Sequence, residues 1–211
     1  MAQQKSLYTY SGKLDNTVGF LGRGGKRHVR FFTGKYNDKK SQEQLAARLR
    51  FKLLTQAAAA VSGFLRLGFN KSFGSTMSPT NAFVKLSYVG GVTGTYPNLE
   101  LSPKDLVVSY GSIDNPFSPT ANADGEDITV SWSDNSGLGN AEATDKVMLL
   151  LYNPAKQQSV YSLAVADRST RTATLSAPAT WAGDQIAVYL AMQRPTTGET
   201  SKSVHLGIFT I

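Results

Sequence analysis

Cations and aromatic rings are interleaved between residues 20 and 40 of this 211-residue chain. Guanidinium and ammonium groups attract phosphates and carboxylates, and rings such as those of Phe20, Phe31 and Phe32 could stack on nucleic-acid bases. The pattern therefore predicts a surface that binds an anionic partner. The cationic residues of this surface are Arg23, Lys26, Arg27, Arg30, Lys35, Lys39 and Lys40.

The sequence leaves three interpretations of this surface open. It binds nucleic acid, or it docks on an acidic surface of a neighbouring subunit, or it is merely solvated. Docking on protein is favoured, because basic patches also serve assembly. The cluster of Asp124, Glu126 and Asp127 is a candidate acidic partner on another copy, although its simplest interpretation is a solvated loop edge.

The charge of the chain is distributed unevenly. Residues 1–80 carry 14 Lys or Arg against 3 Asp or Glu, whereas residues 81–211 carry 8 against 12. The N-terminal part is therefore at +11 and the remainder at −4, within a net charge of +7. This asymmetry is the strongest physical signal of the composition, and it indicates an anionic partner for the N-terminal part.

No set of side chains predicts catalysis. The chain has no cysteine, which excludes disulfides, thiolate metal sites and a cysteine nucleophile. Its two histidines, His28 and His205, fall in different parts of the sequence, and neither has a spacing typical of a catalytic triad or a metal site. We therefore expect no enzyme and no cofactor.

Two stretches resemble phosphate- or metal-binding loops but lack the residues that such loops require. Gly22 to Lys26 lacks the Gly-Lys-Ser/Thr ending of a phosphate loop, because Arg27 follows Lys26. The loop from Asp134 to Asp145 is rich in oxygen ligands, but calcium needs about six to eight converging oxygens, and EF-hand spacing is absent. Asx residues and glycine are ordinary turn chemistry, so we expect no metal.

The cationic surface requires a hairpin and helices to position it. Residues 17–21 and 26–32 read as two strands around a glycine-rich turn, and a hairpin of this size needs a packing partner. Ser41 and Gln44 fit the capping box of a long helix, which we interpret as an assembly helix. A second helix is expected over residues 79–89, with Ser78 as its cap. The interface residues of the assembly helix are Leu45, Arg48, Leu49, Leu53, Val61, Phe64 and Leu65.

The C-terminal half alternates strand patterns with turn signals, which is typical of an all-β sandwich. The expected fold is therefore an α+β N-terminal region, with a basic β-hairpin and two helices, followed by an immunoglobulin-like sandwich. The expected domains are residues 1–100 and 101–211, and residues 90–97 are expected to be loop. The predicted strands are 106–110, 128–132, 146–153, 159–165, 172–175, 185–192 and 203–211.

Two resemblances add to this interpretation. Trp132 on the second predicted strand and the order of seven strands resemble a fibronectin type III or immunoglobulin-like sandwich. Nearly the whole chain resembles an uncharacterised family of about 200-residue proteins from Bacteroidota and their phages and prophages, which implies a fold and a host range but no reaction. The motifs that carry this second resemblance are Gly12-Lys13-Leu14, Val18-Gly19, Gln44, Arg48, Phe51, Leu67-Gly68-Phe69, Gly94-Thr95-Tyr96-Pro97, Asp134-Asn135-Ser136-Gly137, Ala143-Thr144-Asp145-Lys146 and Tyr152-Asn153-Pro154-Ala155-Lys156.

These observations favour a non-catalytic structural protein that forms a homo-oligomer or binds other virion proteins. In this hypothesis the basic half of one copy meets the acidic half of the next, and the assembly helix is buried at the interface. The expected location is a phage or prophage virion, with the cytoplasm as the alternative, because no secretory signal and no membrane span are recognisable. A nucleic-acid-binding protein and an exported adhesin or glycan-binding module, with Tyr161 or Trp181 exposed, are the alternative functions.

Overall fold

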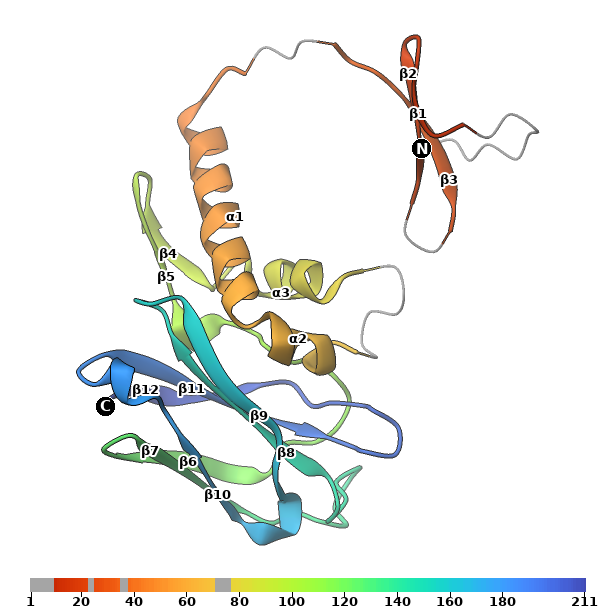
Figure 1. The fold of residues 1–211 in the computed structure, drawn as a ribbon. Helices are drawn as coiled ribbons and strands as arrows, with labels where there is room; N and C mark the ends of the chain where they lie inside the picture. Colours follow the sequence, from red (N-terminus) through yellow and green to blue (C-terminus); the bar gives the residue numbers. More distant parts are fainter. Residues whose placement is uncertain (1–9, 23–24, 35–37, 71–76) are drawn as a thin grey trace. The chain divides into compact units, whose positions relative to one another are not determined.

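The chain consists of two compact units, residues 1–41 and residues 42–211 (Figure 1). The structure is a computed structural model, and it describes residues 10–22, 25–34, 38–70 and 77–211. Each unit is described by itself below. The sequence placed a boundary near residue 100, whereas the division lies after Ser41.

The first unit is a three-stranded antiparallel sheet in the order β1-β2-β3. Its strands are β1 (Gly12–Leu14), β2 (Thr17–Leu21) and β3 (Arg27–Phe31). The predicted hairpin is confirmed as β2 and β3, with Leu21 opposite Arg27, and β1 is an additional strand. Gly19 is the one buried residue among those described in this sheet, so the described part of the unit has no hydrophobic core of its own.

Three helices open the second unit. They are α1 (Gln42–Ala60), α2 (Ser62–Gly68) and α3 (Pro79–Ser87). The predicted assembly helix is divided at Val61, whose φ of −105° and ψ of 16° interrupt the helical path. Its continuation α2 turns onto the sandwich, where Gly63 leaves room for the Tyr161 hydroxyl. The cap of α3 is confirmed, because the Ser78 hydroxyl accepts a hydrogen bond from the Asn81 amide at 3.2 Å.

A short hairpin follows α3, in the region that was predicted to be a loop. It consists of β4 (Val92–Thr95) and β5 (Asn98–Leu101), and Val92 pairs with Leu101. Glycines at 90, 91 and 94 conceal this strand pattern in the sequence, because glycine in a strand usually indicates a turn or bulge. The hairpin lies beside α1, and its leucines join the core beneath that helix.

Seven strands form the sandwich. A three-stranded sheet has the order β10-β7-β6, and a four-stranded sheet has the order β12-β11-β8-β9. Two sheets with this strand distribution correspond to a fibronectin type III-like arrangement. The strands are β6 (Phe117–Asp124), β7 (Asp127–Ser133), β8 (Lys146–Asn153), β9 (Gln158–Asp167), β10 (Thr172–Ser176), β11 (Gln185–Gln193) and β12 (Val204–Thr210).

Six of the seven predicted strands are confirmed, and the first one is wrong. Residues 106–110 form an extended segment outside any sheet, and β6 takes the first place in the sandwich. Side chains satisfy the backbone of that segment: the Val107 amide donates to the Ser87 hydroxyl at 3.1 Å and the Val108 amide to the Ser203 hydroxyl at 3.0 Å. Its apolar pattern therefore reflects burial between elements and not strand pairing.

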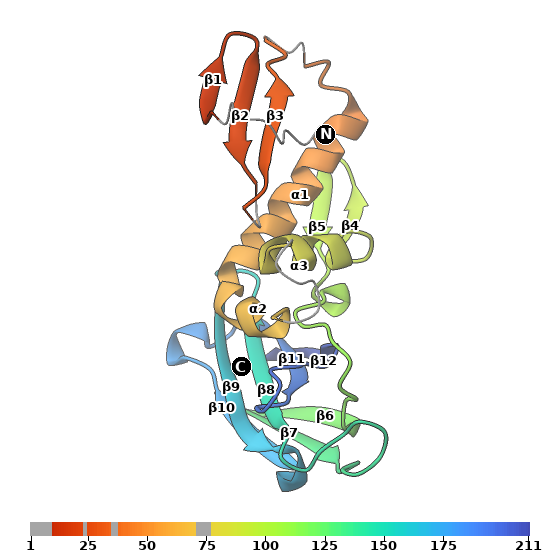
Figure 2. The same cartoon turned by 90° about the vertical axis from the view of Figure 1, so that its right-hand side faces the viewer.

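The helices cover one face of the four-stranded sheet, and the three-stranded sheet covers the other (Figure 2). Alternate residues of β8 and β11 therefore lie in two cores: Leu150 and Tyr189 face the helices, whereas Leu151 and Val188 face the sandwich interior. A strand buried on both faces reads as a continuous apolar run. Residues 42–100 pack on the outer face of β8 and β11 and therefore share a core with the sandwich.

Gly111 lies where the segment before β6 packs closely against the turn before β12. A Cβ on Gly111 would lie 1.9 Å from the Thr200 carbonyl oxygen. We expect Gly111→Ala to lower the free energy of unfolding by about 1–3 kcal/mol, the usual cost of overpacking. Urea unfolding would measure it, with the exposed Ser112→Ala as a control that should stay within about 0.5 kcal/mol of wild type. An unchanged Gly111→Ala midpoint would contradict this packing.

Candidate functional site

The register of the N-terminal sheet divides its side chains between two unlike faces. Directly paired residues project to the same side, and successive residues along a strand alternate. Val18 pairs with both Lys13 and Arg30, so these three residues share one side, which we call the cationic face. The cationic face also carries Phe20, His28 and Phe32. The opposite side, which we call the apolar face, carries Leu14, Leu21, Val29 and Phe31 with Thr17, Gly19 and Arg27.

Rings and cations contact one another on the cationic face. The Lys13 Nζ lies 4.1 Å from the centroid of the Phe32 ring, and the Arg30 guanidinium carbon lies 6.0 Å from that of Phe20. His28 stacks on Phe20 with ring centroids 5.4 Å apart. Phe20 and Phe32 are nevertheless 37% and 47% exposed. The face can therefore present positive charge and aromatic surface to a partner together.

The apolar face is almost bare. Leu14, Leu21 and Phe31 are 61%, 65% and 78% exposed. Tyr10 lies over Gly19, where a Cβ would meet the Tyr10 ring at 2.9 Å, and its hydroxyl is 2.5 Å from that of Thr17. These clustered, exposed apolar side chains make the face a candidate interaction site.

The structure places the seven predicted cationic residues at different points. Arg30 lies on the cationic face and Arg27 on the apolar face, while Lys26, Lys39 and Lys40 are exposed outside the strands. Arg23 and Lys35 lie outside the described residues. Sequence reasoning missed Lys13, because β1 is too short to be recognised and only the register places Lys13 beside Arg30.

The predicted interface of the assembly helix is split between the protein's own core and its surface. Val61, Phe64 and Leu65 are buried beside Leu150 and Tyr189 of the four-stranded sheet, so a neighbouring subunit cannot reach them. The remaining members of that set, Leu45, Arg48, Leu49 and Leu53, lie on the earlier turns of α1 and are half-buried or exposed. A role of these turns in assembly stays a prediction.

The loop weighed as a calcium site is held by a buried ion-pair network. The Arg168 guanidinium donates to the Asp145 carboxylate at 3.0 Å, and both side chains are fully buried. Arg168 also donates to the Asn135 side-chain oxygen at 2.6 Å and to the Asp114 carbonyl at 2.8 Å. Arg194 donates to the other Asp145 oxygen at 3.1 Å. Two guanidinium groups therefore occupy the Asp145 oxygens, and the network anchors the loop.

The histidines and acidic residues do not gather into a site in the part of the chain that the structure describes. No group of three His, Cys, Asp or Glu side chains there could hold a metal ion. His205 packs edge-on against Tyr189 at 5.3 Å, and burial lowers the pKa of its imidazole, with a smaller contribution from Lys104. Trp181 is buried, whereas Tyr161 is 40% exposed. No helix among residues 42–70 and 77–87 is long and apolar enough to cross a membrane.

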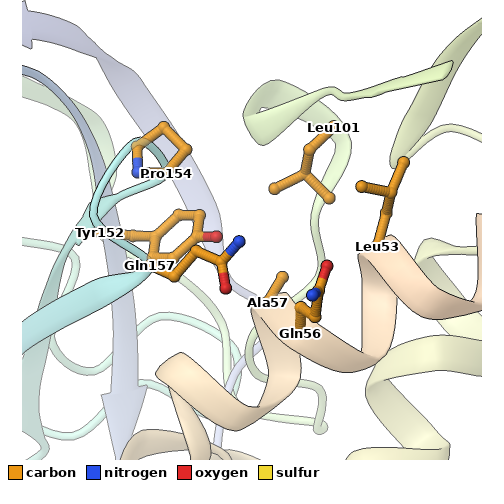
Figure 3. A pocket seen from close by; sticks show the side chains of 7 residues that line it. All are labelled: Leu53, Gln56, Ala57, Leu101, Tyr152, Pro154 and Gln157. Carbon is orange, nitrogen blue, oxygen red and sulfur yellow. The ribbon is translucent and has the colours of Figure 1, made fainter. Parts of the chain in front are cut away.

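A small pocket lies between α1, β5 and the turn after β8 (Figure 3). Its volume is about 80 Å³, well below the roughly 300–1,000 Å³ of pockets that enclose small-molecule ligands. Gln56 and Gln157 supply amide groups from opposite walls, so the space suits water rather than an organic ligand. The lining residues are Leu53, Gln56, Ala57, Leu101, Tyr152, Pro154 and Gln157.

Tyr152 beside this pocket predicts a loss of stability at alkaline pH. Burial raises the pKa of its phenol to about 12, so the folded state keeps a proton that the unfolded state loses above pH 10. Its stabilising contribution is complete below pH 10 and is lost as the pH rises through 12. Between pH 9 and pH 11.5, wild type should lose about 2 kcal/mol more than Tyr152→Phe in urea unfolding. Equal losses in the two proteins would contradict this, and Tyr161→Phe is the matched control.

Comparisons with known proteins identify a family. A family model described as "Family of unknown function (DUF6266)" matches residues 9–207. No curated protein matches the chain. Among solved structures, the chain is similar to the solution structure of the fn3 domain of the human collagen alpha-1(XX) chain. That match has 15% identity and a TM-score of 0.30, and it covers 47% of this chain and 89% of that one.

Proposed function

Because the chain belongs to DUF6266, a family of unknown function, we propose its function from its own surfaces. The protein is a non-catalytic structural protein that self-associates through its N-terminal sheet. A phage or prophage particle is the assembly that the sequence resemblance supports. The sandwich and helices of residues 42–211 form the body of each copy, and the apolar face of the sheet is the contact between copies.

The observation that carries this proposal is the missing core of the N-terminal sheet. An antiparallel sheet is stable when one face packs on a hydrophobic layer and the other faces water. Here the cationic face suits water, whereas Leu14, Leu21 and Phe31 on the apolar face are exposed, and Tyr10 covers Gly19. Two or three strands without such a layer are marginal in water. The sheet therefore needs a second layer, and every other copy of the chain offers an equivalent apolar face.

The size of the face indicates that a single contact between two copies is weak. Strands of three, five and five residues present a face of roughly 200 Å², whereas a stable interface buries about 800 Å² per partner. Exposed Phe51 on α1 and Val89 after α3 offer a separate apolar contact, which growth beyond a pair of copies requires. Single contacts should then be weak, and association should rise with concentration.

The mass of the full-length, nuclease-treated protein tests the proposal. Light scattering over a concentration series should show a mass that rises from monomer toward large species. High salt should favour association, because it screens the repulsion between positively charged copies and leaves apolar contacts intact. A monomer at the highest concentration and at every salt concentration would refute self-association.

A further inference from the structure

The described cations of the N-terminal unit have no carboxylate partner. Among the described residues, Lys13, Lys26, Arg27, Arg30, Lys39 and Lys40 form no ion pair with a carboxylate. In the second unit, by contrast, Lys146, Lys156, Arg168 and Arg194 each contact a carboxylate. The described part of the first unit therefore holds positive charge that no carboxylate of its own balances.

Other copies of the chain cannot neutralise the net charge of an assembly. Residues 1–41 carry nine Lys or Arg against two Asp, whereas residues 42–211 carry thirteen of each sign. Each added copy therefore brings a net charge of +7 with it, whichever surfaces meet. An assembly of identical chains accumulates positive charge, which favours binding of an anionic molecule of another kind.

The side chains beside the cations indicate the chemical class of the anionic partner. The cationic face combines Lys13 and Arg30 with the exposed rings of Phe20 and Phe32. A simple anion would use the cations alone, but single-stranded nucleic acid offers phosphates for the cations and unpaired bases that stack on rings. A duplex keeps its bases stacked on each other and cannot use the rings.

We propose that the cationic face of the N-terminal sheet binds single-stranded nucleic acid. Lys13 and Arg30 contact backbone phosphates, and Phe20 and Phe32 take bases once the cations turn from the rings to the phosphates. The site lies on the opposite side of the sheet from the self-association contact. One copy can therefore bind a strand while its apolar face is covered.

Fluorescence anisotropy of a labelled single-stranded 20-mer tests this, with nuclease-treated full-length protein below the concentration at which it associates. The affinity should fall steeply with salt, since cations displace counterions from the strand. Lys13→Gln with Arg30→Gln should weaken binding at least about tenfold and make the salt slope shallower by roughly 1–2 units. Phe32→Ser should weaken binding about five- to tenfold with an unchanged salt slope, as loss of stacking requires.

Control variants and control ligands distinguish this proposal from non-specific binding of anions. Phe32→Tyr should restore binding, and Lys26→Gln with Arg27→Gln should cost clearly less than the Lys13 and Arg30 pair. A duplex of the same sequence and inorganic polyphosphate should both bind more weakly and be insensitive to Phe32→Ser. Binding that is equal for all three ligands, or equally sensitive to both pairs of cations, would overturn the proposal. So would tighter binding to anionic phospholipid vesicles.

Discussion

Replacing Arg168 by methionine is expected to lower the free energy of unfolding of residues 42–211 by about 3–5 kcal/mol, the usual cost of breaking a buried ion pair. Methionine keeps much of the side-chain volume but removes the donors that reach Asp145, Asn135 and the Asp114 carbonyl. These groups are then partly desolvated without their partner, and Arg194 satisfies only Asp145. Urea unfolding at a concentration where the protein is monomeric would measure the loss.

Lys146→Met is the matched control for that experiment. Lys146 also contacts a carboxylate, that of Asp167, but both side chains are more than a third exposed. Water screens such a pair, so its loss should cost at most about 1 kcal/mol. Equal, small effects of Arg168→Met and Lys146→Met would show that the buried network does not hold the loop of residues 134–145.

Phe31→Ser is expected to abolish self-association, which is the largest effect on the proposed function. Phe31 is the most exposed apolar side chain of the sheet, and serine removes most of the surface that a neighbouring copy would bury. Each contact in a large assembly loses the same buried apolar surface, so the loss of binding free energy adds up over the contacts. The large species should therefore be absent from light scattering at every concentration. The monomer should stay folded, because residues 42–211 have their own core.

Phe32→Ser is the matched control, because it changes the same residue type one position along on the opposite face. It should leave the mass distribution unchanged while weakening nucleic-acid binding. Phe31→Ser should abolish association but leave nucleic-acid binding, measured at low protein concentration, unchanged. Loss of association in both variants would indicate that the sheet unfolds, and loss in neither would exclude the apolar face as the contact.

The sequence predicted the sandwich well because local patterns determine it. Six strands were recognised from apolar runs bounded by turns, and Ser78 and Pro79 identified the start of α3. The segment 106–110 was wrongly taken as a strand, because burial against helices produces the same apolar pattern as pairing. The cover of helices on the four-stranded sheet could not be predicted, since it depends on contacts between residues far apart in the chain.

The candidate surface was predicted in part. Composition located the positive charge, but the division into two faces depends on the register, which no local pattern specifies when both faces are exposed. Lys13 was therefore missed, and Arg27, which was predicted on one surface with Arg30, lies on the opposite face. Helical periodicity placed Val61, Phe64 and Leu65 in an interface, although periodicity cannot distinguish a neighbouring subunit from the protein's own sheet.

Cysteine protection would test the central claim, that another copy covers the apolar face, most directly. The chain has no cysteine, so single Leu21→Cys and Phe20→Cys variants report on neighbouring positions of opposite faces. The reaction of each thiol with a maleimide would be followed from dilute to concentrated protein. If another copy covers the apolar face, the Leu21→Cys thiol should become protected from the maleimide as the mass rises. The Phe20→Cys thiol should stay reactive. Equal reactivity of Leu21→Cys at all concentrations, with an unchanged rise in mass, would contradict it.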